Sequence, residues 1–265
     1  MPDVSTDDGL TLIAVGVLAF IVADVTHEGL GHGIATLAVG GKAVILTSSY
    51  FGSSGSVSRW IPAAGGLANI VAGFLAWLAL RLWKGMGAQA RYFFALLIAF
   101  NWLFAAAYPA YSGVAGFGDW AAVIAGLSPG WLWRMLLVVI SVTCYYLSLR
   151  VIAAEMSPFG TPGTPQALER LRRTTLIPYL AALAVAGLAG AFNPRGWVNI
   201  FTAALPAAAG TFGVTQIDHF LAGEKDSSTT GAGAIRRSIG WIGAAAIVSV
   251  FFVGVLGPGI RFDPR

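Results

Sequence analysis

Seven apolar stretches dominate this sequence, and they restrict its fold more than any other feature. Six are strong candidates for membrane spans and the seventh is shorter; they lie near 10–38, 60–83, 91–112, 131–153, 174–192, 197–221 and 239–259. A helix needs about 20 apolar residues to cross a bilayer, and inside lipid each backbone polar group must find a partner within the protein. The sequence therefore predicts an all-α polytopic membrane protein of six or seven transmembrane helices, with a single domain over 1–265.

The composition points to the same class. Of the 265 residues, 57% are apolar and 11% are charged, whereas an ordinary soluble domain has about 25% charged residues. The single cysteine, Cys144, excludes an intrachain disulfide and a zinc site built from thiolates. The net charge of +4 lies in the connections, where Lys and Arg contact anionic lipid, and no nucleic-acid-binding pattern is present. We expect a multi-pass protein of a bacterial-type plasma membrane, surrounded by membrane lipids.

Three connections carry predictions of their own. Residues 40–59 include a Gly-Gly pair and a stretch rich in Ser, Gly and Val, which favours a short strand or a re-entrant hairpin. Residues 166–173 have a basic amphipathic pattern, which predicts a short helix on the membrane surface. Residues 223–238 are polar and glycine-containing, which indicates an exposed loop.

A cluster of ionisable residues interrupts the first apolar stretch. It consists of Asp24, His27, Glu28 and His32, and it holds two of the chain's three histidines. Such groups cost several kcal/mol in hydrocarbon unless they pair with one another or bind a ligand. A divalent cation would offset the carboxylate charge and accept the imidazole lone pairs. The cluster therefore predicts a metal site inside the membrane.

The spacing of the two histidines sets a condition on the helix. His27-Glu28 followed by His32 is one residue longer than HExxH, the pattern in which two imidazoles bind zinc and the glutamate activates water. On a regular helix, residues five apart point about 140° away from each other. A π-helical turn would return them to one face, and Gly29 and Gly31 would ease it. We predict a first helix broken or bulged here, one Zn²⁺ ion, and Glu28 as the catalytic base.

A hydrolytic zinc site also needs a third protein ligand and an open position for water. Asp119 is the favoured ligand, because it lies in the glycine-rich stretch 113–120, where the backbone can approach closely. Asp218 and His219, in the sixth apolar stretch, are the alternative ligands.

Asp24 lies one helical turn before His27. From there it could accept the second ring N–H of that imidazole and so orient a metal ligand. Alternatively, it is an acid that extends toward the membrane interface.

Three motifs resemble the site-2-protease-like intramembrane zinc metalloproteases. Residues 27–33, followed by Gly40-Gly41, are similar to the family's HExxH-containing helix and its Gly-Gly turn, with one inserted residue. Residues 63–69, Ala-Ala-Gly-Gly-Leu-Ala-Asn, are similar to its Gly-Pro-x-x-Asn stretch, with Gly66 in place of proline. Residues 118–120, Gly-Asp-Trp, stand in the place of its Asp-Gly motif. The resemblance covers about the first 120 residues.

This resemblance implies a metal-site core over 1–120, with additional spans over 121–265. The core would cleave a transmembrane peptide substrate, which an edge strand from 42–58 could hold extended. Asn69 would hold the substrate or polarise its carbonyl; its alternative is an interhelical hydrogen bond. Two other functions stay open: a membrane zinc hydrolase acting on lipid amide or ester bonds, and a non-catalytic metal-binding protein or transporter.

Overall fold

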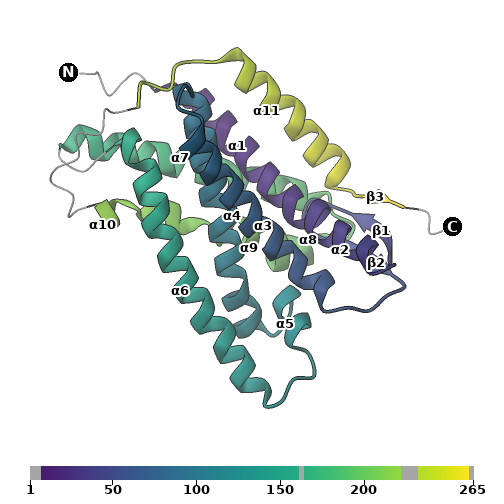
Figure 1. The fold of residues 1–265 in the computed structure, drawn as a ribbon. Helices are drawn as coiled ribbons and strands as arrows, with labels where there is room; N and C mark the ends of the chain where they lie inside the picture. Colours follow the sequence, from purple (N-terminus) through teal and green to yellow (C-terminus); the bar gives the residue numbers. More distant parts are fainter. Residues whose placement is uncertain (1–6, 161–163, 222–231, 263–265) are drawn as a thin grey trace.

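The computed structural model describes residues 7–160, 164–221 and 232–262. In these ranges the chain is mostly helical, with a small three-stranded sheet at one end of the molecule (Figure 1). Seven helical segments are long and apolar enough to cross a membrane: Gly9–Ala38, Trp60–Leu82, Ala88–Ala115, Gly130–Phe159, Pro165–Ala191, Trp197–Leu221 and Ile239–Leu256. The predicted multi-pass helical class is confirmed, including the shorter seventh segment. The particular membrane stays a prediction.

The first of these segments contains three successive helical forms. α1 (Gly9–Val25) begins after Asp8, whose carboxylate accepts hydrogen bonds from the backbone N–H and the hydroxyl of Thr11. A π-helical segment, Thr26–His32, follows and leads into α2 (Gly33–Ala38). The first helix is therefore irregular at the predicted place, but as a bulge and not as an interruption.

The connection after α2 forms the predicted hairpin. β1 (Lys42–Leu46) pairs with β2 (Phe51–Ser54) on one side and with β3 (Ile260–Arg261) on the other, both antiparallel. The strand order is β2-β1-β3, so β2 is an outer strand.

The tip of this hairpin is fixed to the helices. The Asn193 side chain donates a hydrogen bond of 3.1 Å to Thr47, and the Asn199 side chain donates one of 2.6 Å to Ser49. All four residues are buried. The hairpin is therefore held against the helical bundle by Asn193 from the connection after the fifth span and by Asn199 from the start of the sixth.

Among the second to fourth spans, the third is the central helix. The three spans are α3 (Trp60–Leu82), α4 (Ala88–Ala115) and α6 (Gly130–Met156), which a 3₁₀ turn extends over Ser157–Phe159. α4 contacts α1, α3 and α6, and α1 and α4 belong to the two most buried spans. Pro109 lies inside α4 without ending it.

The last spans are less regular. α8 (Trp197–Asn199), α9 (Leu205–Ala209) and α10 (Asp218–Leu221) are separated by π-helical and 3₁₀ turns over 200–204 and 212–216. α11 (Ile239–Phe251) continues as a π-helical turn over Phe252–Leu256 and packs against α1.

The separate surface helix predicted for 166–173 is wrong. These residues are the first turns of α7 (Pro165–Ala191), which Thr164 caps and which continues through Pro178. The basic side chain of Arg170 binds the buried carboxylate of Asp7 at 2.7 Å, so it contributes to the packing of the helix. Most of the predicted loop 223–238 lies outside the described residues.

Candidate metal centre

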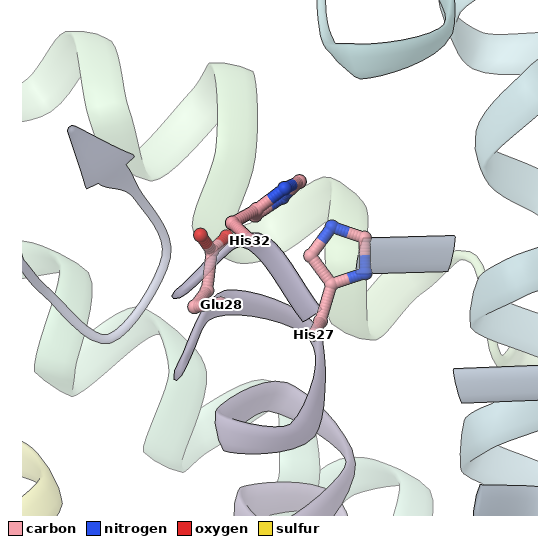
Figure 2. Close-up of side chains that lie close together, drawn as sticks. All are labelled: His27, Glu28 and His32. Atoms are coloured by element: carbon pink, nitrogen blue, oxygen red, sulfur yellow. The ribbon is translucent and has the colours of Figure 1, made fainter. Parts of the chain in front are cut away.

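Three side chains of the π-helical segment form a compact buried group. His27, Glu28 and His32 place one ligand atom each within 4.8 Å of the others, so the group can hold a metal ion. All three gather on one side of the segment (Figure 2), and the two imidazole centroids are 4.9 Å apart. The wider π turn explains how residues five apart reach the same side.

His27 is oriented by a chain of amide hydrogen bonds that joins three helices. Its Nδ1 atom lies 2.7 Å from Oδ1 of Asn69. The Asn69 amide group uses its two hydrogens at 2.8 Å, one toward the Ala23 carbonyl and one toward Asn101. Because Asn69 Oδ1 is then an acceptor, the His27 Nδ1–H donates to it and the lone pair of a neutral imidazole lies on Nε2.

His32 is oriented in the same sense by the backbone. Its Nδ1 atom lies 2.7 Å from the carbonyl oxygen of Ile61, at the start of α3. A carbonyl can only accept, so this Nδ1–H also donates and leaves the lone pair on Nε2. The Phe51 ring of β2 stacks near His32, with the centroids 6.3 Å apart.

Asp119, from a distant part of the chain, places a carboxylate oxygen beside both imidazoles. It is the first residue of α5 (Asp119–Ile124), and its Oδ2 atom lies 3.0 Å from Nε2 of His27 and 3.1 Å from Nε2 of His32. Three acceptor atoms thus face one another, which requires protons or a cation between them. Tetrahedral zinc holds nitrogen and oxygen ligands at about 2.0–2.2 Å, which puts neighbouring ligand atoms about 3.3 Å apart. One divalent cation would satisfy all three atoms with small adjustments.

The electrostatics of Asp119 agree with this arrangement. Burial acts to raise the pKa of its carboxyl group, but the hydrogen bonds and charges of His27 and His32 lower it by more. The net pKa lies well below the ordinary value for aspartate. Asp119 is therefore ionised at neutral pH, as a carboxylate ligand must be.

The segment around Asp119 is held at both ends by arginines. Gly118, directly before it, has a φ of +89°, a conformation that glycine adopts without strain. The Arg134 guanidinium donates to the carbonyl oxygens of Gly113 and Val114, at 2.6 and 2.7 Å. The Arg59 guanidinium donates to two carbonyl oxygens at the end of α5, each at 2.7 Å. These contacts replace helix hydrogen bonds that the carbonyls lack.

Two glycines let α3 approach the histidines. A Cβ atom on Gly65 would lie 2.6 Å from Nε2 of His27 and 2.7 Å from Cε1 of His32. A Cβ atom on Gly31 would lie 2.6 Å from the Cα atom of Gly65. A larger residue at position 65 would therefore collide with the imidazoles. A larger residue at position 31 would push the π-helical segment away from α3.

The role predicted for Asp24 is wrong, because Asn69 and Asp119 contact the two ring nitrogens of His27. Asp24 is only 3% exposed, and its Oδ2 atom has no hydrogen-bond partner within the described part of the chain. It lines a cavity of about 310 Å³ that also reaches His27 and Glu28.

The Asn69 side chain has no free hydrogen-bonding group for the predicted contact with a substrate. Asn69 is fully buried, and both its amide hydrogens and its carbonyl oxygen are engaged between helices. The alternative, an interhelical hydrogen bond, is what the structure contains, extended to the orientation of His27.

The alternative ligands Asp218 and His219 do not reach this site. Asp218 pairs with Arg172 at 3.3 Å, and the side chain of His219 is 73% exposed. Both belong to α10, which contacts α6 and α7 and lies at the other end of the molecule from α2 (Figure 1).

Comparisons of the chain with models of protein families, with curated proteins and with solved structures found no match. The fold and the site define the class directly: a multi-pass helical membrane protein with a buried His–Glu–His group that can hold a metal ion.

Proposed function

We propose that this chain is an intramembrane zinc metalloprotease that cleaves peptide bonds of membrane-embedded substrates. The observation that carries the proposal is the convergence of three acceptor atoms, Nε2 of His27, Nε2 of His32 and Oδ2 of Asp119, at 3.0 and 3.1 Å. The motifs that resemble site-2-protease-like enzymes supply the same three positions, so the resemblance and the geometry support one ligand set.

The donor set favours zinc over the other common divalent ions. Two imidazoles and one carboxylate are typical of catalytic zinc sites, whereas magnesium and calcium favour sites made of oxygen atoms. When bound, zinc lowers the pKa of a coordinated water to about 7 and polarises a carbonyl group. His27, His32 and Asp119 would hold the ion, and the hydrogen bonds on both Nδ1 atoms would keep the rings in the binding orientation.

Glu28 is the residue placed to move protons. It is buried and lies beside both imidazoles, and the strand β2 packs against its π-helical segment. In the proposed reaction its carboxylate takes a proton from the attacking water and delivers that proton to the leaving nitrogen. The helices around it exclude bulk water, which strengthens its interaction with charges in the site.

The position of β2 favours a peptide over a lipid substrate. β2 is an outer strand that packs against the π-helical segment, and the ring of its first residue, Phe51, stacks near His32. An extended peptide can pair with an outer strand through backbone hydrogen bonds, and an acyl chain cannot. A transmembrane substrate that unwinds beside β2 would therefore present its carbonyls next to Glu28.

Metal analysis of purified protein and three variants tests the proposal. We expect one zinc ion per wild-type chain and loss of metal in His27→Ala and in Asp119→Asn. Glu28→Gln should keep the metal, because the amide has the same shape, but it should lower turnover of transmembrane peptides by at least about a hundredfold. Stoichiometric metal in the His27→Ala variant would refute the site. Full metal with unchanged turnover in Glu28→Gln would refute the proteolytic mechanism.

A further inference from the structure

The cavity beside the metal centre has an unusual chemical character. It holds about 310 Å³ and extends from His27 and Glu28 to the segment 202–210 of the sixth span. Much of its wall is apolar, from residues such as Phe104, Ala203 and Ala207. A space of this size accommodates a large side chain or a short alkyl chain.

Asp24 is the unsatisfied group of this cavity. It precedes Glu28 by four residues on the same face of the helix, about 6 Å along the axis. Its residue is 3% exposed, and its Oδ2 atom finds no partner among the described residues. A buried carboxyl without a partner costs several kcal/mol, and a ligand that supplies the missing donor would remove this cost.

The charges in the site indicate the sign of that ligand. A divalent cation at the histidines would be offset by Asp119 and Glu28, so it would leave Asp24 without a cationic partner. A positive charge in the cavity would stabilise the carboxylate form of Asp24. The described residues that line the cavity include no lysine or arginine. The nearby Arg59 and Arg134 are engaged with backbone carbonyls. A positive charge that stabilises the Asp24 carboxylate would therefore come from the ligand.

We propose that this cavity is a specificity pocket that binds a primary ammonium group on an apolar stem, with Asp24 as the acceptor. The proposal rests on the function proposed above, since it places the ammonium one side chain away from the reacting carbonyl. A lysine carries its ammonium on a flexible four-carbon stem, which suits the separation of about one helical turn between Glu28 and Asp24. The ammonium head of a membrane lipid has the same chemistry.

Photolabelling tests the pocket without any need for turnover. The probes are a diazirine-bearing n-hexylamine and the matching n-hexanol, applied to the full chain in detergent, and mass spectrometry measures saturable labelling of residues 202–210. We expect the amine to label the wild-type protein and Asp24→Asn to raise the apparent Kd at least tenfold. The alcohol should label weakly in both. Equal amine labelling of wild type and Asp24→Asn, or equal labelling by amine and alcohol, would overturn the proposal.

Two further variants separate the pocket from general effects. Asp218→Asn removes a carboxylate that lies outside the cavity, so it should label as the wild type does. Ala207→Phe fills the cavity and leaves Asp24 in place, so it should abolish labelling. Persistent labelling of Ala207→Phe at wild-type affinity would show that the probe binds elsewhere, which would also overturn the proposal.

Competition distinguishes the source of the ammonium group. A transmembrane peptide with one lysine should displace the amine probe, whereas the same peptide with norleucine should not. If vesicle lipids with ethanolamine head groups compete and the lysine peptide does not, the ligand is a lipid and the peptide arm is refuted. These measurements detect binding and not catalysis, so the pocket and the proposed proteolysis can fail separately. A protein without metal or turnover could still bind the amine, and an active protease could fail to bind it.

Discussion

Replacing Gly65 by alanine should disable the metal centre with little change elsewhere. The new Cβ atom would lie 2.6 Å from Nε2 of His27 and 2.7 Å from Cε1 of His32. Heavy atoms in contact normally lie about 3.5–4.0 Å apart, so the imidazoles would have to retreat by about 1 Å. Both rings are anchored at Nδ1 by hydrogen bonds of 2.7 Å, so a retreat breaks either these bonds or the convergence on Asp119.

The expected loss can be given a size. Removing a partner that orients a metal ligand typically lowers metal affinity by about 10–100-fold, and we expect at least this for Gly65→Ala. The measurement is competition for Zn²⁺ against a chromophoric chelator, in detergent, after removal of bound metal. Overpacking of this kind costs about 1–3 kcal/mol of stability, so the helical signal should persist at 25 °C.

Gly29→Ala is the matched control. Gly29 belongs to the same π-helical segment, but its Cβ atom would meet only Val25 at 3.7 Å and Leu46 at 3.8 Å, which are ordinary contacts. This variant should therefore keep wild-type metal affinity. If Gly65→Ala binds zinc as tightly as Gly29→Ala does, the imidazoles do not form the site in the arrangement described, and the reasoning fails.

Three other perturbations have distinct expected results. Asn69→Ala should lower zinc affinity about 10–100-fold, because the His27 ring loses the acceptor on Nδ1; the chelator competition assay measures this. Arg134→Ala should also lower zinc affinity in that assay, while Arg134→Lys recovers only part of it, since two carbonyls before α5 lose a forked donor. Asp7→Asn should lower the free energy of unfolding by about 3 kcal/mol in a denaturant titration and leave zinc affinity unchanged, because it breaks a buried pair with Arg170.

The spans were predictable because hydropathy is a local property. Each of the seven predicted stretches overlaps one helical segment of the structure, with ends that differ by a few residues in most cases. The largest difference is at the start of α7, which hydropathy predicts at 174 and which lies at Pro165. Its first turns are basic and amphipathic, but Arg170 is neutralised by Asp7, a residue 163 positions earlier. No local pattern contains that pairing.

The irregular helix was predictable for a related reason. Two histidines five apart can share an ion only if the helix widens by one residue, so the spacing itself indicates a π turn. Asp119 was favoured from its glycine context, and Gly118 does have the positive φ that such a context permits. In both cases the sequence carries the backbone requirement directly.

The supporting contacts of the site could not be derived in this way. Asp24 was expected to orient His27 because it lies one turn away, whereas the orienting group is Asn69, 42 residues later. Which of two polar residues reaches an imidazole depends on how α1, α3 and α4 pack, and that packing depends on Gly31 and Gly65 at their closest approach. The one available signal was that Asn69 lies in an apolar helix, where an amide needs partners.

Glu28 determines whether the centre is catalytic or structural. A structural zinc site has four protein ligands, and a catalytic one has three with an open position. His27, His32 and Asp119 supply three atoms, and Glu28 is close enough to the two imidazoles to be a fourth ligand. However, the outer strand β2 packs against the π-helical segment that carries Glu28, so the carboxylate lies beside that strand. A metal ligand has no need to lie beside the strand with which a peptide substrate would pair. A general base does, because it must reach the water that attacks the peptide carbonyl. The position of β2 therefore favours three ligands and an open position, which is the arrangement that hydrolysis requires.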